Sequence, residues 1–160
     1  ALQFIYTLFI GILVATFIGL GIDAFYEAPT RPEYPKELSM PSANHDPNKP
    51  YEQSDEERQS QLKYEEESKQ YEERFKDYNQ NVSIIALIFS VIILIVSLTL
   101  MKNLQLISDG LLLGGLLTLL YSVIRGFMTD SSKFRFSVVT AGLIAALIVG
   151  YMKFVKSTKV

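Results

Sequence analysis

The chain has 160 residues and a formal net charge of −2, and it contains neither cysteine nor tryptophan. The near-neutral charge argues against nucleic acid as a partner. The absence of cysteine excludes disulfides, thiolate metal sites and thiol nucleophiles.

Four long apolar stretches dominate the chain. A membrane span needs about 20 apolar residues, with about 17 as the lower limit, and we predict transmembrane helices over residues 2–22, 82–101, 106–128 and 134–155. The first stretch is longer than the apolar core of a signal peptide, which has about 7–15 residues, so we expect a retained span. The predicted fold class is an all-α integral membrane protein. Its four transmembrane helices carry an acidic, partly helical insert between the first and the second.

The first span has small residues at a four-residue spacing. Gly11, Ala15 and Gly19 therefore share one helix face. Small side chains let another helix approach closely, so we predict that this face packs against a neighbouring helix.

The polar insert that follows is acidic, with 15 acidic and 8 basic residues between Asp23 and Gln80, a net charge of −7. All six prolines of the chain fall in its first half, which predicts a Pro-rich extended linker over residues 23–53. The sequence from Ser54 to Glu57 fits a capping box. We therefore predict an acidic amphipathic helix over residues 54–81, continuous with the second span.

Aromatic residues mark one face of this acidic helix. Tyr64, Tyr71 and Tyr78 repeat every seven residues, and Phe75 follows Tyr71 by four. One interpretation is a short coiled coil with a partner subunit. The other is packing against the Pro-rich linker of the same chain.

The second span contains three serines spaced seven residues apart, Ser83, Ser90 and Ser97. They could line an oligomeric pore. They could also bond their own helix carbonyls or a neighbouring helix, which costs little free energy and which we favour.

The connection after the second span is short, so the second and third spans must be antiparallel neighbours, and Ser108 is placed to cap the third. Small residues again recur every four positions in the third and fourth spans. We expect these two faces to meet each other or a second subunit. The faces consist of Gly110, Gly114, Thr118 and Ser122 in the third span, and of Gly142, Ala146 and Gly150 in the fourth.

A small basic cluster surrounds the connection between the third and fourth spans. Its members are Arg125, Lys133 and Arg135. The cluster could bind an anionic lipid headgroup or the acidic helix. Ordinary anchoring at the membrane interface is the interpretation that we favour.

The distribution of basic residues does not decide the orientation. A raw count of basic residues near the membrane would place the insert in the cytoplasm. The acidic residues that follow the first span favour the opposite. We predict a plasma (inner) membrane protein with both termini cytoplasmic and the insert, residues 23–81, extracytoplasmic.

Candidates for chemistry are few. The sequence has no HExxH, GxSxG or P-loop motif, and His45 beside Asp46 supplies too few ligands for a metal. The apolar cores of the predicted spans, residues 2–22, 82–101, 110–124 and 136–152, hold no Asp, Glu, Lys, Arg or His, and only Arg125 lies at an edge. This argues against a proton-coupled transporter. We expect no enzyme, no cofactor and no identifiable small-molecule substrate.

The predicted function is that of a structural or accessory subunit of an oligomeric membrane assembly. Its partners would be the lipid bilayer and either further copies of this chain or other membrane subunits. The small-residue helix faces and the aromatic helix would make the contacts. The alternative is a homo-oligomeric channel lined by the second transmembrane helix.

Overall fold

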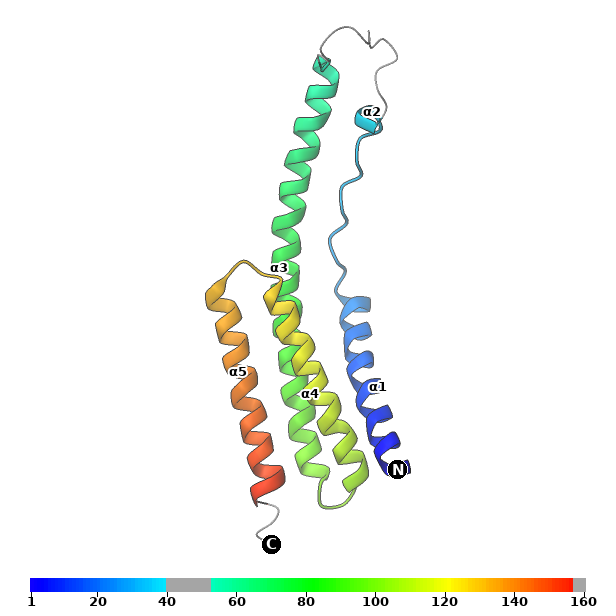
Figure 1. Cartoon of the computed structure of the whole chain (residues 1–160), viewed down its shortest axis with the longest axis vertical. Coiled ribbons are helices and arrows are strands. Elements are labelled where there is room, and N and C mark those ends of the chain that lie inside the picture. Colours follow the sequence, from blue (N-terminus) through cyan, green and yellow to red (C-terminus); the bar gives the residue numbers. More distant parts are fainter. Residues whose placement is uncertain (40–52, 157–160) are drawn as a thin grey trace. The chain divides into compact units, whose positions relative to one another are not determined.

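The computed structural model describes residues 1–39 and 53–156, and all regular structure within them is helical. Four helices are long and apolar enough to cross a membrane, which confirms the predicted fold class: this is an all-helical integral membrane protein. The helices are α1 (Leu2–Phe25), α2 (Lys36–Ser39), α3 (Asp55–Leu100), α4 (Gln105–Phe127), α5 (Ser132–Gly150) and the π-helix η1 (Tyr151–Lys156), which continues α5 (Figure 1).

The chain divides into two compact units. One contains residues 1–28 and the chain from residue 76 onward, and the other contains residues 29–75. In the second unit the predicted linker includes the short helix α2. Residues 40–52 of that linker, with His45, lie outside the described residues.

The start of α3 is set by a capping box. The backbone N–H of Glu57 donates to the Ser54 hydroxyl at 3.2 Å, and the N–H of Ser54 donates to the Glu57 carboxylate at 3.1 Å. These bonds satisfy two backbone donors that a helix start leaves free. Because no proline or glycine follows before Leu100, nothing breaks the backbone hydrogen bonds, and α3 runs unbroken into its apolar part.

Linker residues cover the aromatic face of α3 within the unit formed by residues 29–75. The Tyr34 ring meets the Tyr64 ring edge-on, with centroids 5.2 Å apart. The Arg31 guanidinium lies 6.0 Å from the centre of the Tyr71 ring, which itself stacks on Phe75. This is the contact that the second interpretation of the aromatic face describes. Contact of the same residues with a partner subunit stays a prediction.

In the other unit, α4 is the helix that touches all three remaining membrane helices. It packs against α1 and α5, and hydrogen bonds join it to α3. Figure 1 shows α1 running alongside α4.

The contact between α1 and α4 uses glycines as notches for larger side chains. A Cβ at Gly114 would lie 2.7 Å from Val14 Cβ, and one at Gly110 would lie 2.7 Å from Ile10 Cγ2. From the opposite side, a Cβ at Gly11 would lie 2.7 Å from Leu113 Cγ. Both helices therefore contribute a glycine to the closest approach, as small-residue packing in membranes requires.

This arrangement differs from the expected meeting of the small faces of the third and fourth spans. Gly110 and Gly114 face α1 instead, and Gly142 of α5 lies against Leu119 of α4, whose Cδ2 would be 3.0 Å from a Cβ at that position. A glycine notch filled by a leucine leaves no void, whereas two small faces opposite each other contact well only when the helix backbones nearly touch.

The other predicted packing residues have different surroundings. Ala15 and Ala146 are half-buried, while Thr118 and Ser122 are buried in the bundle. Nothing lies within 4 Å of a Cβ placed at Gly19 or Gly150. The intramolecular contacts therefore use only part of the predicted small-residue faces.

The predicted capping role of Ser108 is wrong. Helix α4 begins at Gln105, with Leu104 at the cap position, so Ser108 lies one turn inside the helix. Its hydroxyl donates to the carbonyl of Ser97 at 2.8 Å. The side chain serves the contact between two helices and not the end of one.

The close contact of Gly114 with α1 leads to a prediction about the free energy of unfolding. We expect Gly114→Ala to lower the free energy of unfolding by about 1–3 kcal/mol, because the added methyl group meets the stiff, β-branched Val14. Gly21→Ala is the matched control, since it adds the same methyl group in open space on α1 and should cost no stability. Equilibrium unfolding in mixed micelles measures both. Equal stability of Gly114→Ala and wild type would contradict the packing described.

Candidate functional site

Buried hydroxyls form a ladder between α3 and α4. The Ser83, Ser90 and Ser97 side chains are 0% exposed, and each donates to a backbone carbonyl of α4, at 2.8, 2.8 and 2.7 Å respectively. The acceptors are the carbonyls of Ser122, Gly115 and Ser108. Each seven-residue step along α3 is thus matched by a seven-residue step back along α4, and we call these six residues the serine ladder.

The two ends of the serine ladder are reciprocal. The Ser122 hydroxyl donates to the Ser83 carbonyl at 2.6 Å, and the Ser108 hydroxyl donates to the Ser97 carbonyl at 2.8 Å. At the middle rung Gly115 takes the place of a second serine, because Leu94 would lie 2.7 Å from a Cβ there. The ladder therefore satisfies its hydroxyls within the bundle, where no water is at hand to do so.

These contacts bear on the channel alternative, in which the same three serines would line a pore. Their hydroxyls point to α4 of the same chain and not to an open surface. A lumen lined by them would require α3 and α4 to separate and to lose all these hydrogen bonds.

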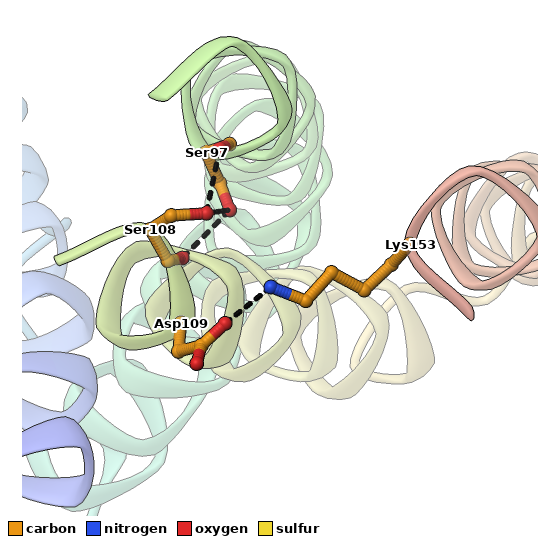
Figure 2. A network of polar contacts seen from close by, with 4 residues as sticks. All are labelled: Ser97, Ser108, Asp109 and Lys153. Carbon is orange, nitrogen blue, oxygen red and sulfur yellow. Dashed lines mark hydrogen bonds and ion pairs between the residues drawn. The ribbon is translucent and has the colours of Figure 1, made fainter. Parts of the chain in front are cut away.

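A second polar cluster lies where the hairpin of α3 and α4 closes. Asp109, one turn inside α4, forms an ion pair with Lys153 of η1. Figure 2 shows the Lys153 side chain extending from its own helix toward this carboxylate, next to the last rung of the serine ladder, Ser97 and Ser108. The lysine side chain is only 13% exposed and the carboxylate 35%. The pair neutralises two charges and ties η1 to α4.

Arg125 organises a third cluster at the other end of the bundle. Its Nη1 donates to the Asn79 side-chain oxygen at 2.9 Å, and its Nε donates to the Tyr121 hydroxyl at 3.1 Å. The guanidinium also lies 5.2 Å from the centre of the Tyr121 ring and 5.9 Å from that of Tyr78, within range of a cation–π interaction. Asn79 is fully buried, so Arg125 links α4 firmly to α3.

Tyr78 extends this cluster to α1. Its ring stacks on that of Tyr26, with centroids 5.2 Å apart, and the Tyr26 hydroxyl accepts a hydrogen bond of 2.8 Å from Asn81. Tyr78 precedes the predicted span that begins at Val82. Burial raises the pKa of its phenol, an effect that the positive charge of Arg125 partly offsets. The phenol therefore stays neutral and serves packing.

The three residues of the predicted basic cluster lie in different surroundings. Arg125 turns to Asn79, whereas both Nε and Nη2 of Arg135 donate to the Thr129 carbonyl. Lys133 is exposed. Each cation thus has its own surroundings, and binding of a headgroup by all three stays a prediction.

Sequence reasoning missed Asp109 and Lys153 as partners because they lie 44 residues apart and no spacing relates them. Asn79 could have been found, since it lies four residues before Ser83 and so shares its helix face. The matching steps of Ser108 and Ser122 around Gly115 were also visible in the sequence. The sequence instead predicts that Ser108 caps the third span and that Ser122 meets the fourth span or a second subunit.

The chemistry available to these clusters is limited. Every hydroxyl of the serine ladder donates to a backbone carbonyl, so none is poised as a nucleophile. Among residues 1–39 and 53–156, no three His, Cys, Asp or Glu side chains gather in a group that could hold a metal ion. The arrangement positions helices.

Because the chain contains no cysteine, pairs of introduced cysteines can test the contacts of the serine ladder. In the double variant Ser97→Cys/Ser108→Cys we expect rapid oxidation within one chain, because the two hydroxyl oxygens that the sulfurs replace lie 3.4 Å apart and a small side-chain shift brings the sulfurs to the disulfide distance of about 2 Å. The mismatched pair Ser83→Cys/Ser108→Cys is the control. Its positions lie about 20 Å apart along the hairpin.

Mass spectrometry after alkylation counts the remaining free thiols. Two alkylated thiols in the matched pair, or a crosslink between chains, would contradict the ladder. Such a result would instead fit a lumen that exposes these positions.

The ion pair predicts a coupling between Asp109 and Lys153. In a double-mutant cycle with Asp109→Asn and Lys153→Met we expect a coupling energy of about 0.5–1 kcal/mol, since partial exposure screens the attraction. Lys156→Met is the control because Lys156 is exposed in the same helix. Unfolding in mixed micelles at low and high salt measures the coupling. A coupling of zero at low salt would show that the pair does not fix η1.

Comparison with known proteins gives no family assignment. No protein-family model matches the chain, and no curated protein and no solved structure is significantly similar to it. What the clusters do is therefore argued from their own contacts.

Proposed function

We propose that this chain is a structural subunit of a membrane assembly and that a second copy of it is the partner. The contact would lie in a groove of about 500 Å³ between α1 and α4. Small residues of α1 form one wall of this groove, and the end of α4 forms the other. Its lining consists of Ala15, Thr16, Gly19, Leu20, Asp23, Tyr121 and Arg125.

The observation that carries the proposal is the open space at Gly19. Five glycines of the bundle have a neighbouring side chain within 3.0 Å of a Cβ placed on them, namely Gly11, Gly110, Gly114, Gly115 and Gly142. Gly19 lies two helical turns along α1 from Gly11, on the same face, yet nothing lies within 4 Å of a Cβ placed there. A helix that approached this face would find the same kind of notch that α4 uses further along α1.

The partner that we propose is α1 of a second copy. An isologous dimer places the same surface on both sides of a two-fold axis, and the small face of α1 suits such a contact because each copy supplies a notch. Large apolar side chains elsewhere on α1, such as Phe9 and Phe17, are exposed and would face lipid or the partner.

Polar residues at the end of the groove would set the register between the groove and the second helix. Arg125 is already held by Asn79 and Tyr121, so its position is fixed before a partner arrives. Asp23 is exposed beside it. A polar group from the second helix could meet this carboxylate at the membrane edge and set how far the helices overlap.

The use of the other polar groups supports a structural role over catalysis. The serine ladder, the pair of Asp109 with Lys153 and the Arg125 cluster all join one helix of the bundle to another. We therefore propose no reaction for this chain.

The test is the mass of the protein in lipid nanodiscs by native mass spectrometry. We expect a defined homo-oligomer for the wild type and a monomer for Gly19→Leu, which fills the groove. Gly21→Leu is the matched control, because Gly21 is also open but lies on the opposite side of α1, and it should keep the oligomer. A monomeric wild type, or an oligomer unchanged by Gly19→Leu, would overturn the proposal.

A further inference from the structure

A second groove, between α3 and α5, has a different character. It has a volume of about 660 Å³, and aliphatic side chains line nearly all of it. Val91, Ile95 and Leu98 contribute from α3, and Ala141, Ala145 and Ile148 contribute from α5. The groove does not involve α1, so it is independent of the contact proposed above.

The polar content of this groove is already satisfied. Thr99 supplies the one hydroxyl among the lining residues, and it donates to the Ile95 carbonyl at 2.9 Å. The groove therefore offers its occupant no unpaired hydroxyl. An occupant that matches it is apolar along its whole buried length.

The length of the groove distinguishes between two kinds of apolar occupant. Its wall on α5 and η1 runs from Ala141 to Met152, which is about 16 Å at 1.5 Å per residue. One leaflet of the hydrocarbon core is about 15 Å thick, whereas a transmembrane helix needs the full 30 Å or about 20 residues. The groove thus fits an acyl chain from one leaflet better than it fits a spanning helix.

Positive charge lies near one end of this groove, at the ends of α3 and η1. Thr99 and Met152 line that end, and one turn further along the chain from each comes a lysine, Lys102 and Lys156. Both lysines are exposed. Lys153 in the same region is neutralised by Asp109, so the charge that remains at the rim is positive.

We infer that the groove between α3 and α5 is a phospholipid site, which holds one acyl chain of an anionic lipid and places its phosphate at Lys102 and Lys156. The apolar wall supplies affinity for any phospholipid of the leaflet. The two lysines supply the preference for a headgroup with net negative charge, through the attraction that basic residues near a membrane surface exert on anionic lipids.

The test is native mass spectrometry of the full chain in detergent micelles, titrated with phosphatidylglycerol or with phosphatidylcholine of the same acyl chains. We expect one lipid per chain, with phosphatidylglycerol bound more tightly. Lys102→Ser and Lys156→Ser should each weaken phosphatidylglycerol binding about fivefold and leave phosphatidylcholine unchanged. Lys133→Ser is the matched control, since Lys133 is an exposed lysine at the other end of α5.

A variant of the apolar wall tests the other half of the site. Ala145→Phe should abolish binding of both lipids, and Leu147→Phe, at an exposed position of α5 outside the groove, should not. Circular dichroism establishes that each variant is folded, and if Ala145→Phe does not fold, the lysine variants decide. Equal binding of both lipids to wild type, or lysine variants that behave like Lys133→Ser, would overturn the inference.

A second copy of the chain in the groove would give another pattern. Ala145→Phe would then change the mass of the oligomer, with no lipid bound to the wild type, and this result would also overturn the inference. Because Gly19→Leu acts only on α1, its effect on the oligomer is read separately from lipid binding.

Discussion

The close contact between α3 and α4 is the constraint on which the rest of the bundle depends. A helix pair joined by hydroxyl-to-carbonyl hydrogen bonds must approach closely at every rung, and small residues stand on both helices where Ser83, Ser90 and Ser97 meet α4. Burial of apolar surface does not drive helices together inside a bilayer, because lipid tails are equally apolar. Packing and hydrogen bonds must do so, and the serine ladder provides both. With α4 held in this way, its remaining faces receive α1 and α5.

Charged side chains join the helices to one another at the two ends of the bundle. A charge in a membrane is tolerated when it is paired or lies near the surface. Lys153 meets Asp109 at one end, and at the other Arg125 meets neutral partners, the Asn79 amide and two tyrosine rings. These contacts act at helix ends, where they set how far one helix is shifted along another. The ladder between them sets the distance.

Two of the grooves that remain open after these contacts are made differ in physical character. The groove beside α1 has a wall that includes the small residues Ala15 and Gly19 and a carboxylate at its end, which suits a helix with a polar group. The groove between α3 and α5 is aliphatic and one leaflet long, with lysines at its rim. We therefore propose one surface of the bundle for protein and another for lipid.

The sequence by itself determined the helices. Apolar length marked four spans, the capping box from Ser54 to Glu57 marked the start of α3, and the seven-residue spacing of the serines marked a contact face. These signals are local, because backbone hydrogen bonding and burial in lipid act on neighbouring residues. Only the tertiary structure decided which faces meet: that Gly110 and Gly114 receive α1, that Ser108 bonds α3 instead of capping α4, and that Asp109 finds Lys153. The small-residue pattern is the same whichever helix fills it, so the choice depends on how side-chain volumes and paired charges fit across the whole bundle.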